Sequence, residues 1–312
     1  LSEIMLQQTR VETVIPYFLR FVERFPNLAA LAEAPLDEVL GLWSGLGYYA
    51  RARNLHRCAT ILAEEHGGAF PQSAEAIAEL PGIGRSTAAA IAAFSFGERS
   101  AILDGNVRRV LCRHRGIVGF PGERAVEQQL WTLAEALLPE RGVDTYTQAL
   151  MDLGSLVCTR SRPVCETCPV AADCVARQKG LTASLPTPRP KRIIPERRSA
   201  VLIARSEGRI LLEKRPPHGI WGGLYALPEI PADQDPEAFA LGHGLTCVGE
   251  TQALATVEHR FTHFLLRIEP SPSARRYAEK GRVKFVYVGE DARSKSDTAP
   301  RLGTVDMLQL VN

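Results

Sequence analysis

The sequence lacks a long hydrophobic run and carries almost no net charge. No apolar stretch among its 312 residues approaches the roughly 18–20 residues that a membrane span requires. The formal net charge is only +2, so any basic surface that binds nucleic acid must be local. The chain starts at Leu1, inside a helical pattern, without a secretory segment or an initiator methionine, and so looks like a fragment. We expect a cytoplasmic protein that has no membrane partner.

Cysteine is scarce, and most of it lies in one short segment. Four of the seven cysteines follow the spacing Cys158-x6-Cys165-x2-Cys168-x5-Cys174. An odd count without a secretory signal favours a metal site over a disulfide framework. Four thiolates this close together can hold a cubane iron–sulfur cluster or a zinc ion. Zinc ribbons usually place two CxxC pairs far apart, and this chain has a single such pair. The cysteines alone leave both an iron–sulfur cluster and a zinc ion open. The three scattered cysteines, which we expect to be buried apolar residues, are Cys58, Cys112 and Cys247.

The hydrophobic period changes from helix to strand near residue 200. A proline-rich basic segment at residues 185–199 has the composition of an extended connector. We therefore predict a helical domain at residues 1–184 that includes the cysteine loop of residues 158–174, a linker at 185–199, and a second domain at 200–312. In that second domain, strands are expected at 200–205, 209–214, 263–269 and 283–289, with a short helix at 235–244.

Residues 80–111 combine a glycine-rich turn with a later carboxylate. Pro81, Gly82 and Gly84 precede an alanine-rich helical run, where positive φ at the glycines would leave bare amides at a helix N-terminus. Such a terminus binds phosphate, which DNA presents at regular intervals. Asp104 is a predicted N-cap of the next helix. Taken separately, the two halves also fit an ordinary helical hairpin and an ordinary cap.

Two further segments carry polar and aromatic residues in helical or turn settings. Residues 2–25 have helical spacing with a break or kink expected before Pro16, and the polar stripe that includes Glu3 fits a solvated helix face. Residues 41–56 join a glycine-rich turn with two tyrosines to a basic helix. Leu46, Gly47 and Tyr48 followed by Arg51 and Arg53 have the composition of a wedge and backbone clamp for distorted duplex DNA, or of a loop with packed aromatics.

The order of these motifs resembles one protein family along nearly the whole chain. The matching segments are SEIMLQQT (2–9), the tyrosine turn (41–56), LPGIG (80–84), LDGNVRRVL (103–111), the cysteine loop (158–174), LLEKRPPHGIWGGLYALPE (211–229) and EHRFTHFLL (258–266). Together they resemble the adenine DNA glycosylases of the MutY family, which belong to the helix-hairpin-helix glycosylases. The resemblance implies an all-α glycosylase domain with an iron–sulfur loop, followed by an α+β Nudix-like domain.

The resemblance also implies a reaction and a partner. The reaction is hydrolysis of the N-glycosidic bond of adenine mispaired with 8-oxoguanine or guanine, in base excision repair. The partner is double-stranded DNA that contains the mispair. The enzyme is expected to be a monomer, and its location, as in bacteria, is the cytoplasm in association with the nucleoid. The cofactor is a [4Fe-4S] cluster on Cys158, Cys165, Cys168 and Cys174.

Roles for single residues follow from the same resemblance. Glu3 is the expected general acid, Asp104 the carboxylate that stabilises the sugar cation, and Asn106 the residue that orients Asp104. The expected DNA contacts are Gln8 and Tyr48 as residues that fill or wedge the duplex, Thr9, Leu46 and Thr262 at the oxidised guanine, Phe261 and His263 shaping that loop, and Gly82, Gly84 and Ser86 at the hairpin.

Two departures narrow the alternatives. Bifunctional glycosylase/lyases carry lysine where this chain has Ser86, so no Schiff base can form there, and an endonuclease III-type lyase is disfavoured. The run of metal-binding glutamates of a catalytic Nudix box has no counterpart after Pro228, which argues against a pyrophosphohydrolase. A non-catalytic helix-hairpin-helix DNA-binding protein remains open, and it would make Glu3 and Asp104 incidental.

Overall fold

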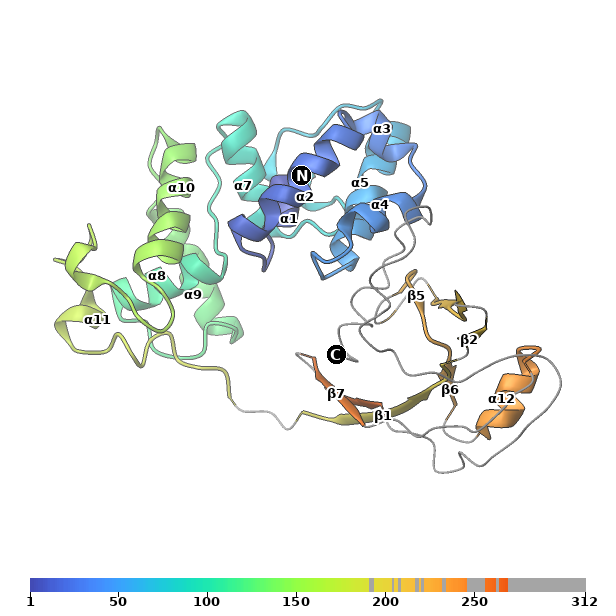
Figure 1. The fold of residues 1–312 in the computed structure, drawn as a ribbon. Helices are drawn as coiled ribbons and strands as arrows, with labels where there is room; N and C mark the ends of the chain where they lie inside the picture. Colours follow the sequence, from blue (N-terminus) through green and yellow to red (C-terminus); the bar gives the residue numbers. More distant parts are fainter. Residues whose placement is uncertain are drawn as a thin grey trace. The chain divides into compact units, whose positions relative to one another are not determined.

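The protein falls into two compact units, which are described separately (Figure 1). The computed structural model describes residues 1–190, 194–203, 205–206, 209–216, 219, 222–231, 234–245, 256–261 and 264–268. The first unit comprises residues 1–34 and 51–191, and the second comprises residues 35–50 and 192–312. The junction at residues 191 and 192 falls within the predicted linker. Residues 35–50, which we expected in the helical domain, group with the second unit. There Lys214 Nζ lies 2.7 Å from each carboxylate oxygen of Asp37.

The first unit is built from helices. They are α1 (Ser2–Met5), α2 (Val11–Arg24), α3 (Leu28–Ala32), α5 (Ala50–Glu65), α6 (Ala74–Ala78), α7 (Arg85–Phe96), α8 (Gly105–Arg115), α9 (Arg124–Ala136), α10 (Val143–Asp152), the π-helical turn η1 (Leu153–Val157), the 3₁₀ turn η2 (Cys165–Thr167) and α11 (Val175–Gln178). Helices α7 and α8 each end at a glycine in the left-handed conformation, Gly97 and Gly116. Glycine commonly ends helices in this way because it adopts positive φ without steric cost.

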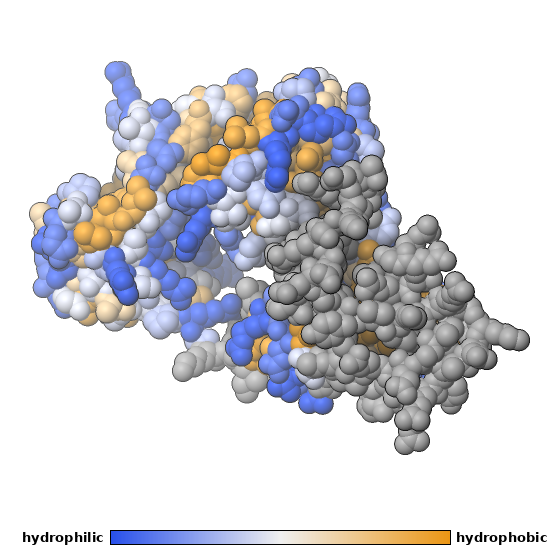
Figure 2. All heavy atoms as spheres, in the orientation of Figure 1, coloured by the Kyte–Doolittle hydropathy of each residue, from blue (hydrophilic) through white to orange (hydrophobic). Residues whose placement is uncertain are grey.

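The helical stretch of residues 2–25 has a break before Pro16, although not directly at it. Helix α2 runs through Pro16, and the break lies earlier, in the turn after α1, where Arg10 is extended and acts as the N-cap of α2. Proline removes a single backbone donor, and burial of Val14 and Phe21 holds the helix. The opposite face of α2 exposes other apolar side chains, Val11, Ile15 and Leu19. Figure 2 shows apolar atoms gathered over this part of the helical unit.

One apolar cluster supports the helix that begins after Asp104. Its buried members come from α7, α8, α9 and the start of α10, and they include Ala93, Leu111, Leu130 and Val143. The segment that leads into α8 belongs to the same cluster, because Leu103 is 1% exposed. Asp104 is therefore attached to a densely packed core rather than to a free loop.

The second unit contains α4 (Leu36–Trp43) and a small mixed sheet. The other elements are β1 (Glu196–Val201), β2 (Arg205–Ser206), β3 (Arg209–Ile210), β4 (Glu213–Lys214), β5 (Tyr225–Ala226), β6 (Glu229–Ile230), α12 (Pro236–Gly242), β7 (Val257–Arg260) and β8 (Leu265–Ile268). The sheet order is β6-β1-β8-β7, with β1 parallel to β8 and the outer pairs antiparallel. Strand pairs β2–β3 and β4–β5 lie apart from it.

The predicted linker ends too late in the sequence. Residues 196–199 form the start of β1, because they pair in parallel register with residues 265–268 of β8. The expected strand at 283–289 lies outside the described residues. A small core of Leu202, Ile230, Phe239 and Ala240 packs α12 against this unit. Within the described part of the chain, none of the helices is both long and apolar enough to cross a membrane.

Candidate active site and cysteine pocket

Glu3 lies in the short helix α1, in a partly buried setting. Burial raises the pKa of its carboxyl above the ordinary value of 4.5, the positive N-terminal amino group opposes this shift, and the negative charge of Asp104 adds to it. The influence of Asp104 shows that the structure brings the two predicted catalytic carboxylates into one electrostatic environment. A raised pKa favours the protonated form, which is the form that a general acid needs.

Asp104 is fixed at the start of α8 by local bonds. Its Oδ1 accepts a hydrogen bond of 2.8 Å from Val107 N, as the predicted N-cap should. Both backbone polar groups of the preceding residue, Leu103, are hydrogen-bonded. Leu103 N donates to Ser86 Oγ at 2.9 Å, and Leu103 O accepts from Arg108 Nε at 3.2 Å. Ser86 thus supports the backbone next to Asp104.

Asn106 is bonded to an arginine within α8. Its Oδ1 accepts from Arg109 Nη2 at 2.8 Å, and the same guanidinium donates to Gly154 O at 2.6 Å and to Cys158 O at 2.7 Å. A Cβ on Gly154 would lie 2.6 Å from Asn106 Cβ, so only glycine fits there. Arg109 therefore connects Asn106 and α8 to η1 and the cysteine loop.

The predicted phosphate-binding hairpin joins α6 to α7. Gly82 has a φ of +76°, and a Cβ at this position would lie 2.7 Å from the Asn54 side chain, so both conformation and space call for glycine. Gly84 is the N-cap of α7 with a φ of −88°. The expectation of positive φ at Gly84 is therefore wrong. A Cβ on Gly84 would have no neighbour within 4 Å, which leaves open space at this helix N-terminus.

The turn after α1 has an unusual backbone. Gln8 is exposed and has a φ of +57°. Thr9 Oγ1 donates to Gln7 O at 3.4 Å, and Gln7 Nε2 donates to Thr87 Oγ1 of α7 at 3.3 Å. Gln7 belongs to the same polar stripe as Glu3. Because its side chain bonds to Thr87, this part of the stripe makes a tertiary contact and is not simply a solvated helix face.

Arg51 does not form part of a DNA clamp. Its side chain is buried, with 8% of the residue exposed. Its Nη1 donates to the carbonyl oxygens of Ile4, Met5 and Gln7 at 3.2, 2.7 and 2.6 Å. The predicted phosphate contact for Arg51 is wrong because this guanidinium is engaged with the C-terminal end of α1. No local sequence signal marks the contact, since the partners are 44 to 47 residues apart.

In the tyrosine turn of the second unit, the predicted contact residues Tyr48 and Leu46 differ in exposure. Tyr48 is 54% exposed and has a φ of +51°. Leu46, expected at the oxidised guanine, is 5% exposed and belongs to the interior of its unit. Trp43 Nε1 donates to Gly47 O at 3.0 Å, which closes the turn just before Tyr48. The side chain presented to solvent by this turn is therefore the tyrosine.

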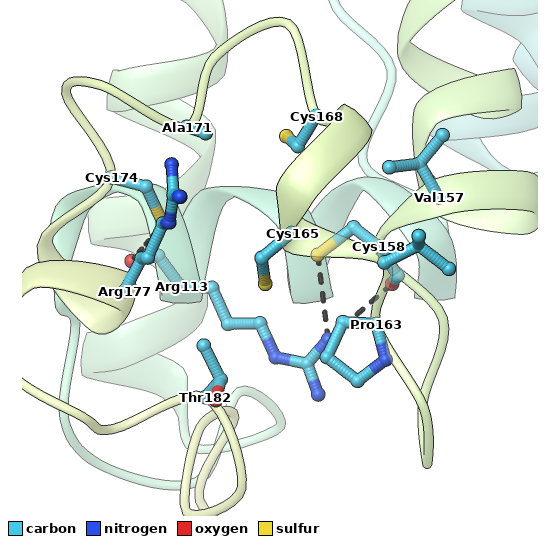
Figure 3. A pocket seen from close by; sticks show the side chains of 11 residues that line it. Arg113, Val157, Cys158, Pro163, Cys165, Cys168, Ala171, Cys174, Arg177 and Thr182 are labelled. Atoms are coloured by element: carbon cyan, nitrogen blue, oxygen red, sulfur yellow. Dashed lines mark hydrogen bonds between the residues drawn. The ribbon is translucent and has the colours of Figure 1, made fainter.

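All four clustered cysteines line one pocket (Figure 3). The lining also includes Arg113, which is 3% exposed. Its guanidinium donates to Cys158 Sγ at 3.4 Å, to Thr159 O at 2.7 Å, to Arg160 O at 3.0 Å and to Leu185 O at 2.8 Å. A buried cation beside four thiol groups suits an anionic centre bound by thiolates, so the donor set fits the expected cluster.

Side chains in the described residues do not converge as three ligands on a single metal ion. The four thiols instead line a shared pocket, together with residues from α8, η1, η2 and α11. Sequence reasoning missed Arg109 and Arg113, which both connect α8 to this loop. Their spacing of four residues on one helix places them on the same face, and that is the sequence signal that could have identified them.

The predicted recognition loop lies between β7 and β8. Phe261 stacks on Phe264 with ring centroids 4.6 Å apart and packs edge-on against His259 at 4.5 Å. Phe261 N also donates to Phe264 O at 2.9 Å, which closes the turn. Phe261 is therefore held by His259 of β7 and by Phe264, which directly precedes β8. Thr262 and His263 lie outside the described residues.

Two families match consecutive parts of the chain. The HhH-GPD superfamily of base excision DNA repair proteins matches residues 1–136, which contain both carboxylates and the hairpin. The NUDIX domain family matches residues 199–295. This order agrees with the predicted architecture of a helix-hairpin-helix glycosylase domain followed by a Nudix-like domain.

Individual relatives and a solved structure agree with these families. An adenine DNA glycosylase of Buchnera aphidicola subsp. Schizaphis graminum (strain Sg) is 38% identical over 270 residues, covering 86% of this chain and 78% of the relative. The Homo sapiens adenine DNA glycosylase is 49% identical over 179 residues, or 57% of this chain and 33% of the relative. A thermostable thymine-DNA glycosylase structure has a TM-score of 0.51 at 28% identity, covering 57% of this chain and 82% of that chain. The chain belongs to the adenine DNA glycosylase family.

Proposed function

We propose that this glycosylase removes adenine that is paired with 8-oxoguanine, and that Glu3 and Asp104 divide the chemistry. The observation that supports this division most is the pKa of Glu3, which burial and the charge of Asp104 both raise. Asp104 Oδ1 accepts a hydrogen bond from Val107 N, which fixes this carboxyl at the start of α8. The setting of Glu3, in contrast, favours the protonated form of its carboxyl.

The residues act on a base that has left the duplex. Cleavage of an N-glycosidic bond passes through a state that resembles an oxocarbenium ion, so the leaving adenine needs a proton and the sugar needs a nearby anion. Glu3 gives its proton to a ring nitrogen of adenine, and the bond to the sugar breaks with its electron pair passing to the base. Asp104 stabilises the sugar cation until water adds, and the deprotonated Glu3 accepts a proton from that water.

We propose that the enzyme is monofunctional because Ser86 replaces the amine of the lyases. The Ser86 hydroxyl accepts a bond from Leu103 N, next to Asp104. Ser86→Lys would place an amine near the sugar, so we expect strand scission or an adduct trapped by borohydride. The unmodified enzyme should show neither product. Trapping by the unmodified enzyme would contradict the proposal, and absence of trapping in Ser86→Lys would place residue 86 away from the sugar.

Selection of 8-oxoguanine is assigned to the second unit. Its match to the NUDIX family and its lack of the catalytic glutamate run support a recognition role. 8-Oxoguanine differs from guanine by the C8 oxygen and the N7 proton. One hydrogen bond contributes about 0.5–1.5 kcal/mol, and about 1.4 kcal/mol corresponds to tenfold, so each contact gives a modest preference. The segment EHRFTHFLL, residues 258–266, resembles the recognition loop of the family, and this resemblance supports Thr262 as the residue that makes one such contact.

The test measures adenine release from duplexes with A:8-oxoguanine or A:G, followed by alkali to cleave abasic sites. The full chain should excise adenine from both and prefer 8-oxoguanine. Thr262→Ala should lose part of that preference and keep its rate on A:G. Thr145→Ala, at an exposed position of α10, is the matched control. Equal rates of the unmodified enzyme on both duplexes would contradict the specificity proposal.

We propose that Cys158, Cys165, Cys168 and Cys174 bind a [4Fe-4S] cluster. When bound, the cluster would join the four cysteines of the loop to one another, while Arg109 and Arg113 of α8 hold Cys158 by hydrogen bonds. Glycosidic hydrolysis requires no electron transfer from such a cluster. The purified protein should be brown and contain about four irons per chain. Cys165→Ser should lose the colour and weaken DNA binding, while Cys58→Ser, at a buried cysteine outside the pocket, should keep the colour. A colourless protein with one zinc per chain would contradict the proposal.

A further inference from the structure

Gln8 and Tyr48 share a backbone feature that no other non-glycine residue in the described part of the chain has. Their φ angles are +57° and +51°, in the left-handed region. Both side chains are exposed. L-residues adopt this conformation at a cost, and it persists only where the surroundings enforce it. The structure should therefore contain groups that enforce it at each position.

The angle φ of a residue depends on how the preceding peptide group is turned. That peptide group contains the carbonyl oxygen of the preceding residue, so a donor that holds this oxygen also fixes φ of the next residue. At Gln8, the relevant oxygen is Gln7 O. It accepts a bond of 2.6 Å from Arg51 Nη1, and Arg51 is anchored by further bonds to Met5 O and Ile4 O.

The tyrosine turn has the same arrangement, within its own unit. The oxygen before Tyr48 is Gly47 O, and it accepts a bond of 3.0 Å from Trp43 Nε1. Trp43 is fully buried, so its indole cannot follow the turn if the turn moves. In both cases a buried nitrogen donor holds the carbonyl oxygen directly before an exposed residue with positive φ.

We propose that Arg51 and Trp43 are positioning residues that hold Gln8 and Tyr48 in the left-handed conformation before DNA arrives. For each exposed side chain, considered within its own unit, the ligand is the base stack of duplex DNA at a mispair. This inference rests on the proposed role of Gln8 and Tyr48 in the duplex. Because the strain is sustained by the folded protein, binding need not order these backbones, and the affinity for DNA rises accordingly.

The test uses the full chain and a non-cleavable ligand. The probe is a duplex with an A:G mispair whose adenosine carries a 2′-fluoro group, and the measurement is the dissociation constant. Arg51→Met removes the donor, and binding should weaken about tenfold, the equivalent of the cost of the left-handed region. Arg57→Met, at an exposed position of the same helix, should bind as the unmodified protein does.

A second background separates positioning from general destabilisation. Asparagine adopts positive φ more readily than glutamine. In the Gln8→Asn background, Arg51→Met should therefore weaken binding by about threefold or less, because less enforcement is needed. Leu130→Val, in the core around α8, should weaken binding by the same factor in both backgrounds. If Arg51→Met does not fold, Arg51→Lys replaces it, with a smaller expected loss because the amine still donates hydrogen bonds where methionine cannot.

The tyrosine turn provides an independent arm. Trp43→Phe keeps an aromatic ring and removes the donor to Gly47 O, and its loss of affinity should shrink in a Tyr48→His background, because histidine also tolerates positive φ. Unchanged binding in Arg51→Met, or an equal loss in the Gln8 and Gln8→Asn backgrounds, would overturn the inference for Gln8, and the corresponding results with Trp43→Phe would overturn it for Tyr48. Because the probe is not cleaved, these outcomes do not depend on whether Glu3 is the acid.

Discussion

The helices that carry Glu3 and Asp104 are held in place in different ways. Helix α8 spans eleven residues, begins with a side-chain cap from Asp104 itself and packs into the main apolar cluster. Helix α1 spans four residues, has no side-chain cap, and is held at its C-terminal end by Arg51 from α5. Asp104 therefore owes its position to local structure, and Glu3 owes its position to tertiary contacts.

The difference matches the two roles. A helix N-terminus whose amide at Val107 donates to Asp104 favours an anion there, as the stabiliser of a sugar cation requires. A partly buried setting favours the protonated form of a carboxyl, as an acid requires, and burial is the largest cause of the raised pKa of Glu3. The same chemical group thus performs two tasks because the fold gives it two environments.

The largest expected effect comes from removing the acid. Glu3→Gln keeps the size of the side chain and cannot transfer a proton, so single-turnover excision of adenine should fall about 10²–10⁴-fold. Binding to the mispaired duplex should stay close to that of the unmodified protein. Excision by Glu3→Gln within threefold of the unmodified rate would remove Glu3 from the mechanism.

Two substitutions at Asp104 separate its charge from its cap. Both Asp104→Asn and Asp104→Ala should abolish most excision, because neither can stabilise a cation. Asparagine still caps a helix and alanine does not, so Asp104→Ala should unfold more easily by about 1 kcal/mol. Chemical denaturation measures this difference. Equal stability of the two variants would show that the bond from Val107 N does not hold α8.

Two neighbouring hydroxyl groups at the start of α7 support the segments that carry Asp104 and Glu3, one each. Ser86 Oγ accepts from Leu103 N on the Asp104 side at 2.9 Å, and Thr87 Oγ1 accepts from Gln7 Nε2 on the Glu3 side at 3.3 Å. Ser86→Ala leaves a backbone donor without its acceptor, so excision should fall about tenfold, by roughly the value of one hydrogen bond. Thr87→Val breaks the longer bond and should cost less. The reverse order would contradict the view that Asp104 is the more tightly held residue.

The smallest expected effect is on stability and its pH dependence. The pKa of Glu3 in the folded state lies above 4.5, so the folded state binds more protons than the unfolded state as the pH rises past 4.5. Ionisation of Glu3 therefore reduces stability as the pH rises through its folded-state pKa. Glu3→Gln should be more stable than the unmodified protein at neutral pH, and this gain should vanish below pH 4.5. A gain that persists at low pH would have another origin.

Local patterns predicted what local structure determines. The N-cap at Asp104 and the glycine requirement at Gly82 followed from short sequence signals, and the structure has both. The setting of Glu3 could not be predicted in the same way. Its helix is held by Arg51, more than forty residues along the chain, and by Thr87, eighty residues from Gln7.

Two of the errors in the sequence predictions also arise from partners that are distant in sequence. Arg51 was expected to contact phosphate because its position in a basic helix does not reveal burial, and the positive φ expected at Gly84 belongs only to Gly82. Residues 196–199 looked like linker because their strand partner, β8, lies about seventy residues later. Arg51 and residues 196–199 have partners that are distant in sequence, where composition and period carry little information.

The titration of Glu3 tests the division of roles most directly. Carboxyl resonances of ¹³C-labelled glutamate in the unmodified protein and in Glu3→Gln identify the Glu3 signal by its absence from the variant. We predict that this signal titrates above pH 4.5 and that Asp104→Asn lowers its pKa, because the negative charge of Asp104 is one cause of the shift. A Glu3 carboxyl that titrates at or below pH 4.5, unaffected by Asp104→Asn, would contradict its assignment as the acid of this pair.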